Sequence, residues 1–236
     1  MVIGSGIIAN SFLEIFKDRH DICIFASGVS SSICESEHEF QREEKLLAGT
    51  QKELPDGCLL IYFSTCSVKR PSSEHTPYII HKKRMEKVVK SYSPCLVIRL
   101  PQTAGLNGNP DNFLNFIIHS IKNNKEISIW QNVERNLLDV DDLPRIIEEI
   151  TKQKEFKNKT VTVANPESYD VIEIVRLAEK VISKSATIKI EKQQGQDLRR
   201  SNEFLLDDSI LKIISECNSE LSEQIYIEKL IQKYLR

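Results

Sequence analysis

The sequence is poor in the features that mark membrane, secreted and nucleic-acid-binding proteins. No apolar run approaches the about 20 residues that a helix needs to cross a bilayer, so we expect no membrane partner. The 32 Lys and Arg residues nearly balance the 34 Asp and Glu residues, which leaves no basic excess for phosphate backbones and predicts no nucleic-acid partner. Met1 leads directly into Val2-Ile3-Gly4 with no signal-peptide pattern, so a cytoplasmic location is expected.

Cysteine and histidine are not spaced for metal binding or redox chemistry. The 6 cysteines contain no C-x-x-C pair, and the 5 histidines form no H-x-x-x-H or H-E-x-x-H pair. Four of the cysteines lie in or beside apolar runs, where a free thiol behaves as a small hydrophobe. The sequence therefore predicts no metal ion and fits a reducing compartment.

The first 105 residues alternate between short apolar runs and longer segments with helical spacing. The runs predict strands at 1–3, 22–26, 59–65 and 95–100, and the segments between them predict helices near 7–19, 37–52 and 78–92. Strands that are apolar throughout and alternate with helices predict a parallel sheet covered on both faces. This is an α/β fold of the doubly wound, Rossmann-like kind.

A loop from Pro101 to Pro110 predicts a boundary between two lobes. The segments beyond it predict helices and strands in alternation, with helices near 111–124, 143–153 and 171–184 and strands at 127–130, 160–164 and 185–190. Asp141 and Asp142 stand where they could cap the helix that begins near Leu143.

A glycine-rich turn opens the chain. Gly4-Ser5-Gly6-Ile7-Ile8-Ala9 has the form G-x-G-x-x-A and lies between a predicted strand and a predicted helix. Gly4 permits a tight turn, Gly6 allows a pyrophosphate to approach the backbone, and the helix N-terminus attracts an anion. The turn therefore predicts a dinucleotide site, with Gly4, Gly6, Ile7 and Ile8 in contact with the cofactor.

The acidic residue that normally accompanies such a turn is missing. A dinucleotide fold places Asp or Glu at the end of its second strand to hold the adenosine ribose, but the second strand here ends Phe25-Ala26-Ser27-Gly28. Few strands precede Pro101, so we infer that the usual second and third strands have been lost. The first strand would then lie at a sheet edge, with half of the adenosine pocket absent.

A tyrosine and a lysine are spaced for acid-base chemistry. Tyr78 and Lys82 are four residues apart, so a helix places both on one face. A nearby lysine cation favours the phenolate form of tyrosine, and a hydroxyl from Thr65 or Ser64 could hold a substrate oxygen beside it. Such a set can move a proton while a hydride moves to or from nicotinamide.

Several motifs in order resemble the extended short-chain dehydrogenase/reductase family, which contains nucleotide-sugar epimerases, dehydratases and reductases. The glycine turn comes first, and Tyr78 and Lys82 match the family's Y-x-x-x-K. Looser matches follow at the strand end Ala26-Ser27-Gly28, at 63–68, 98–105 and 135–142, and at 195–208. The resemblance covers nearly the whole chain.

The resemblance implies roles by position. Tyr78 would be the catalytic acid or base, Lys82 would tune its pKa and contact the cofactor ribose, and Thr65 would bind the substrate hydroxyl. Further contacts implied for the cofactor are Ala26 and Ser27, and those implied for the substrate are Ser64, Gln102, Arg135 and Arg199, with Arg200 as an alternative to Arg199. The resemblance also implies a Rossmann-like region at 1–104, rejoined by about 131–182, and a substrate lobe at 105–130 and 183–236.

Two functions stay open at this point. The first is an NAD- or NADP-dependent epimerase or reductase that acts on a nucleotide-linked sugar in cell-surface polysaccharide synthesis. Cys66-Ser67 replace the Asp-Glu pair of the family's dehydratases, which disfavours that reaction. The second is an impaired relative that binds or senses a dinucleotide or nucleotide sugar. The resemblance also implies a homodimer that pairs through the helix bearing Tyr78 and Lys82, where Ile79, Ile80, Val88 and Val89 offer apolar surface.

Overall fold

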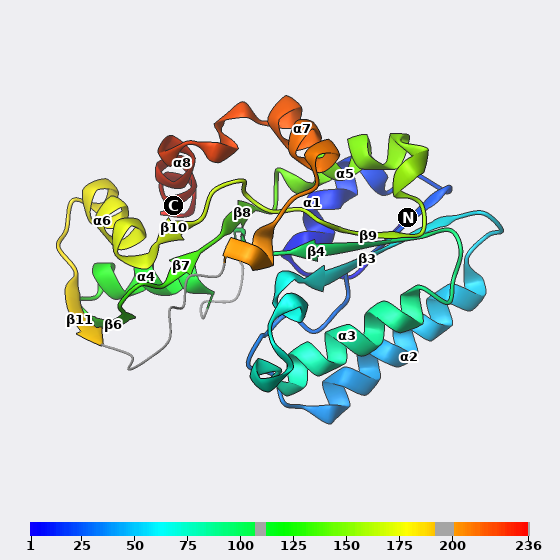
Figure 1. Ribbon diagram of the computed structural model, residues 1–236, viewed down its shortest axis with the longest axis horizontal. Coiled ribbons are helices and arrows are strands. Elements are labelled where there is room, and N and C mark those ends of the chain that lie inside the picture. The colour runs from blue at the N-terminus through cyan, green and yellow to red at the C-terminus, as the bar shows by residue number, and fades with distance from the viewer. Residues whose placement is uncertain (107–111, 192–200, 236) are drawn as a thin grey trace.

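The centre of the protein is a five-stranded parallel sheet, seen in a computed structural model that describes residues 1–106, 112–191 and 201–235 (Figure 1). The strand order is β1-β2-β3-β4-β9, and every neighbouring pair is parallel. These strands are Val2–Ile3, Ile22–Phe25, Leu59–Thr65, Cys95–Leu100 and Lys159–Thr162. The structure confirms the predicted α/β, Rossmann-like fold.

Helices cover both faces of this sheet (Figure 1). Side chains that alternate along a strand point to opposite faces, so Ile22 and Ile24 enter one apolar cluster while Cys23 and Phe25 enter another. The first cluster lies under α1 and α5, and the second lies under α2 and α3. These four helices are Ile7–Phe16, Leu143–Lys152, Glu37–Glu53 and Pro77–Val89.

The first strand lies at the edge of the sheet. β1 pairs with β2 alone in the described chain, whereas the first strand of a complete Rossmann fold lies inside the sheet, in the order 3-2-1-4-5-6. The prediction that two strands have been lost is therefore confirmed. One side of the glycine turn consequently has no strand beside it among the described residues.

A second group of elements packs beside the sheet. β6 pairs in parallel with β11, and α6 packs against α4 and α8. An unbroken apolar cluster joins this group to the α1 and α5 face of the sheet. The elements of the group are α4 (Phe113–Lys122), β6 (Glu126–Trp130), α6 (Val171–Ile182), β11 (Thr187–Glu191) and α8 (Gln224–Tyr234).

Short elements connect the two groups. β5 pairs with β8, β7 pairs with β10, and α7 packs on α5. Their bounds are Gln102–Ala104, Leu137–Asp139, Glu134–Arg135, Tyr169–Asp170 and Asp208–Cys217. Single 3-10 turns occupy Cys66–Lys69, Ser72–Glu74, Lys154–Phe156, Ser201–Phe204 and Ser219–Ser222.

The helix cap expected at Asp141 and Asp142 is confirmed in position at Asp142 but not in side-chain bonding. Asp142 occupies the cap position of α5, but its side chain makes no capping hydrogen bond among the described residues. Its carboxylate instead accepts hydrogen bonds from Tyr226 and Asn218, at 2.7 and 3.1 Å. The pairing with the C-terminal elements has replaced the local cap.

The predicted division into lobes stays a prediction. β9 joins the central sheet and α5 packs on α1, whereas α6 packs with α4 and α8 of the second group. Within the described residues, no helix is both long and apolar enough to cross a bilayer.

Candidate active site

Gly4 sets the shape of the turn that follows β1. Its φ of +130° is a conformation that side chains rarely adopt, and a Cβ there would lie 2.4 Å from the backbone oxygen of Ala26. The turn therefore rests directly on the residue that follows β2. This contact brings two predicted cofactor-binding segments together.

The N-terminus of α1 opens beside this turn. Gly6 is the cap residue, and it has no side chain that could bond to the free N–H groups of the first turn. A Cβ at Gly6 would meet no described atom within 4 Å, so the backbone is open to a ligand. Exposed N–H groups at a helix N-terminus attract an anion such as a phosphate.

Thr65 ends the central strand β3 and begins the 3-10 turn after it. Its hydroxyl oxygen accepts a hydrogen bond from the Ser67 N–H at 3.2 Å and interacts with the phenol of Tyr78. Ser64, the preceding residue, points to the face of the sheet that α2 and α3 cover, where its hydroxyl donates to Glu86 of α3 at 2.7 Å. Arg99 holds the same Glu86 carboxylate through two hydrogen bonds.

Tyr78 lies in the first turn of α3. The Thr76 hydroxyl caps this helix, and Pro77 at its first position favours the helical start. Burial raises the pKa of Tyr78, the negative charge of Glu43 raises it further, and the Thr65 hydroxyl offsets a part of this. The phenol is therefore protonated at neutral pH.

Lys82 lies one turn further along α3, on the same face as Tyr78. Its Nζ atom is 5.9 Å from the centre of the Tyr78 ring, but only 3.0 Å from Glu43 Oε1 and from the Tyr62 hydroxyl oxygen. Burial lowers the pKa of Lys82, and the Glu43 charge opposes this shift. The ammonium group is thus bound to a carboxylate as well as facing the tyrosine.

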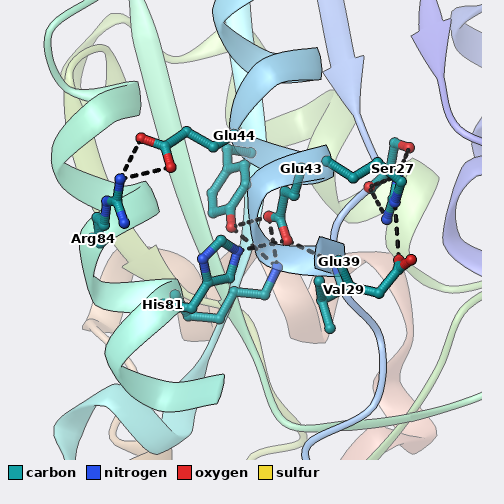
Figure 2. A network of polar contacts seen from close by, with 10 residues as sticks. Ser27, Val29, Glu39, Glu43, Glu44, His81 and Arg84 are labelled. Carbon is teal, nitrogen blue, oxygen red and sulfur yellow. Dashed lines mark hydrogen bonds and ion pairs between the residues drawn. The ribbon is translucent and has the colours of Figure 1, made fainter. Parts of the chain in front are cut away.

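Figure 2 shows the polar network around Glu43, which connects α2, α3, β3 and the loop after β2. The Glu43 side chain is fully buried. Burial alone would raise the pKa of its carboxyl group. Hydrogen bonding from His81, the charge of Lys82, and hydrogen bonds from Tyr62 and the Val29 N–H outweigh burial and hold this pKa at about 2.

One cavity of about 780 Å³ brings most of the predicted site residues together. This volume lies in the range of small-molecule sites, about 300–1,000 Å³. Those that line it are Gly6, Ile7, Ile8, Ala26, Ser27, Ser64, Thr65, Tyr78, Lys82, Gln102 and Arg135. Gly4 is exposed and is not part of the lining, but its backbone lies against Ala26, which is part of it. Arg199 and Arg200 lie outside the described residues.

Sequence reasoning missed several parts of this site, among them Glu43, Tyr62 and the loop at Gly28–Val29. A signal for Glu43 was present, because it lies between Phe40 and Leu47 at helical spacing on the buried face of α2. A carboxylate on an apolar helix face is a rare position that calls for a buried partner. Tyr62, within an apolar strand, gave no such signal.

Arg42 was also missed. It lines the cavity, and its guanidinium donates hydrogen bonds to the backbone and hydroxyl oxygens of Ser27 and to Glu39. Within the described residues, no group of three or more His, Cys, Asp or Glu side chains is arranged to hold a metal ion. Burial raises the pKa of the Cys66 thiol to about 12, so it is protonated at neutral pH.

Solved structures that share this fold include nucleotide-sugar epimerases and a nucleotide-sugar dehydratase. The chain is 18% identical to the UDP-glucuronic acid 4-epimerase from Bacillus cereus, solved with UDP-glucuronic acid and NAD, over 87% of this chain and 76% of that one, with a TM-score of 0.61. It is 16% identical to dTDP-glucose 4,6-dehydratase from Bacillus anthracis, solved with NAD, over 98% and 77%, with a TM-score of 0.65. It is 14% identical to RMD from Pseudomonas aeruginosa, solved with NADPH, over 94% and 90%, with a TM-score of 0.61.

Comparison with curated proteins found no match. A family model for the NAD dependent epimerase/dehydratase family matches residues 27–164, a span that includes Thr65, Tyr78 and Lys82 but not the glycine turn. This span is more than half of the 236 residues. The chain therefore belongs to the NAD dependent epimerase/dehydratase family.

Proposed function

We propose that this protein is an NAD- or NADP-dependent epimerase or reductase that acts on a nucleotide-linked sugar. The observation that carries the proposal is the shared cavity, in which the open N-terminus of α1, the Thr65 and Tyr78 hydroxyls and the Lys82 ammonium line one space. Cofactor and substrate must meet in one such space for a hydride to pass between them. Neighbours solved with NAD or NADPH support a cofactor of this class.

The glycine turn fits a dinucleotide at its diphosphate. Gly6 leaves room for phosphate oxygens, and the N–H groups of α1 would bind them. Ala26, Ser27 and Lys82 line the same cavity, and we place the ribose on the nicotinamide side against them. The adenosine side has less support, because β1 has no strand on its free side in the described chain.

A bound nicotinamide dinucleotide supplies or accepts the hydride. The protonated Tyr78 phenol then provides the matching proton: as a sugar carbonyl carbon gains hydride, its oxygen takes the phenol proton and leaves a phenolate. Thr65 orients that oxygen, and solvent returns the proton to Tyr78. A phenol held in its protonated form favours this reductive direction.

The substrate is assigned to the side of the cavity formed by the connecting elements β5 and β7. Gln102 and Arg135 line the cavity from β5 and β7, and a guanidinium there could bind the sugar nucleotide's diphosphate, with Arg199 as a second cation. We keep the homodimer as part of the proposal. Of the four apolar residues expected on its surface, Ile79 and Val89 are buried within the chain, Val88 is half-buried and Ile80 is 57% exposed.

The second candidate is a binding or sensor protein with little turnover. Two observations favour it: the missing support for the adenosine half, and the Lys82 ammonium bound to Glu43. The intact set of Thr65, Tyr78 and Lys82 around one cavity favours the enzyme.

Binding and turnover measured together test the proposal. NADH and NADPH are titrated by calorimetry, and UDP-, GDP- and dTDP-linked keto sugars are then assayed with the cofactor that binds. We expect micromolar to millimolar binding and turnover that falls by about 10²–10⁴-fold in Tyr78→Phe while cofactor affinity is unchanged. Binding without turnover would favour the sensor, and no binding of either cofactor at millimolar concentration would reject both dinucleotide functions.

A further inference from the structure

Glu43 is a buried carboxylate at the back of the cavity wall. It comes from α2, and its side chain has no exposed surface. The carboxylate of the next residue, Glu44, faces outward and pairs with Arg84 at 2.7 Å (Figure 2). The two carboxylates therefore lie on one helix, but Glu43 is buried whereas Glu44 is partly exposed to solvent.

Four donors meet the two oxygens of Glu43. Oε1 accepts from the Tyr62 hydroxyl at 2.6 Å and from Lys82 Nζ at 3.0 Å, and Oε2 accepts from the Val29 N–H at 2.7 Å and from His81 Nε2 at 3.0 Å. An ionised carboxylate has room for about four such bonds. The acceptor capacity of Glu43 is thus filled, so the carboxylate is fixed in place.

The Glu43 carboxylate also joins the loop at Gly28–Val29 to Lys82. Val29 lies in the loop after β2, which lines the cavity. At Gly28, a Cβ would lie 2.6 Å from Lys82 Nζ and 3.0 Å from Glu43 Oε1, so the loop backbone rests directly on the ion pair. A shift of this loop would therefore displace the Lys82 ammonium group.

We propose that Glu43 is a positioning residue for the proposed reaction: its carboxylate holds the Lys82 ammonium and the Gly28–Val29 loop in one arrangement and offsets the lysine charge beside Tyr78. The role of Glu43 in turnover rests on the proposed function. The contacts of Glu43 with Lys82 and Val29 exist whether or not the protein is an enzyme.

The charge balance of the cluster follows from its members. Glu43 is anionic, and the ammonium of Lys82 offsets it at 3.0 Å, while Tyr78 receives the field of both. Without the Glu43 charge, the cluster would release protons at lower pH. The titratable and charged groups that face the pair are Tyr62 from β3, Tyr78, His81 and Glu86 from α3, and Arg42 from α2.

Glu43→Gln tests the inference, with Glu44→Gln as the matched control on the outer face. The ultraviolet absorbance of tyrosinate is followed against pH, and the signal of Tyr78 is isolated by subtracting the same variant that also carries Tyr78→Phe. We expect tyrosinate formation at Tyr78 to begin at lower pH in Glu43→Gln and to keep its position in Glu44→Gln, with all proteins compared only at pH values where circular dichroism shows them folded. An unchanged onset of tyrosinate formation in Glu43→Gln overturns the inference.

Turnover gives the second readout. If the chain reduces a sugar, the alkaline limb of its pH profile, where Tyr78 loses its proton, moves to lower pH in Glu43→Gln. If no variant turns over any sugar, the proposed function fails, while the tyrosinate titration still decides what Glu43 does. The two failures are therefore distinguishable.

The unaltered protein provides a measurement if Glu43→Gln does not fold. With ¹⁵N-labelled lysine, the Lys82 ammonium signal is assigned by its loss in Lys82→Met or, if that variant is also unfolded, by its coupling to the Glu43 carboxyl carbon. We expect its protons to exchange with water at least about ten-fold more slowly than those of exposed lysines. Exchange as fast as that of exposed lysines would contradict the inference.

Discussion

Two walls of the cavity differ in how well the chain supports them. The tyrosine wall, formed by Thr65, Tyr78 and Lys82, stands on the central strand β3 and on α3, and the Glu43 network ties it to α2. The glycine wall, formed by residues 4–8, stands on the two residues of β1 at the edge of the sheet. The groups that would move protons are rigidly held, whereas the groups that would hold a cofactor have fewer neighbours.

This difference between the two walls bears on two separate properties, proton transfer and cofactor affinity. Proton transfer depends on the position of a few atoms, which the buried network of the tyrosine wall fixes. Cofactor affinity depends on the number of good contacts, which the loss of two strands has reduced. If the proposed function is correct, this chain differs from complete Rossmann folds mainly in how tightly it binds a dinucleotide.

The largest expected effect is on the tyrosine wall. Glu43→Ala leaves Lys82 without its counter-charge in a buried site, so we expect the free energy of unfolding to fall by about 3–5 kcal/mol. Glu44→Ala removes a half-exposed partner of Arg84 and should cost no more than about 1 kcal/mol. Urea unfolding measures both. Equal losses of unfolding free energy in the two variants would mean that the Glu43 network does not stabilise the tyrosine wall more than a surface ion pair does.

Acid should weaken the same wall. The folded protein holds the pKa of Glu43 at about 2 against an ordinary 4.5, so this group stabilises the fold above pH 4.5, by about 3 kcal/mol, and the stabilisation is lost as pH falls towards 2. Unfolding free energies across this window should decline more steeply in the unaltered protein than in Glu43→Gln. Parallel declines would place the acid sensitivity elsewhere.

A smaller effect is expected at the glycine wall. Gly4→Ala would put a side chain at a φ of +130° and 2.4 Å from the Ala26 oxygen, so we expect a loss of about 1–3 kcal/mol. Thermal unfolding followed by circular dichroism would detect it. A stability equal to that of the unaltered protein would show that the β1 edge can yield, and that the glycine wall is softer than its geometry indicates.

The smallest effect on stability is expected at Gly6. A Cβ there meets no described atom within 4 Å, so Gly6→Ala should change the unfolding free energy by less than about 1 kcal/mol. The methyl group would nevertheless stand where phosphate oxygens approach, and NADH binding should weaken by about ten-fold. Calorimetric titration of both proteins is the measurement, and equal affinities would place the diphosphate elsewhere.

The sequence was sufficient for most of the fold. Apolar runs located the strands because parallel strands are buried on both faces. The small number of strands before Pro101 indicated that two strands were missing. The position of the Lys82 ammonium was not predictable in the same way. Its partners Glu43 and Tyr62 lie 39 and 20 residues away in the chain, and no local pattern encodes contacts of that range.

The local elements that carry the candidate site residues could be predicted where a motif names those residues, but tertiary contacts that redirect a side chain could not. Ser64 shares a strand end with Thr65, yet alternation along β3 turns its hydroxyl to Glu86. Asp142 occupies the cap position that its neighbours indicate, but the distant Tyr226 and Asn218 take its carboxylate. In both cases a contact remote in sequence outweighed the local preference.

The shortness of β1 has a consequence for self-association. An open sheet edge presents unpaired backbone groups on which a foreign strand can add, and this is a common route to aggregation. Here the strand at that edge has two residues, Val2 and Ile3, and the chain turns away at Gly4. A strand docking there would gain few backbone hydrogen bonds. Although β1 now lies at the edge of the sheet and not in its interior, its short length therefore limits strand addition at that edge.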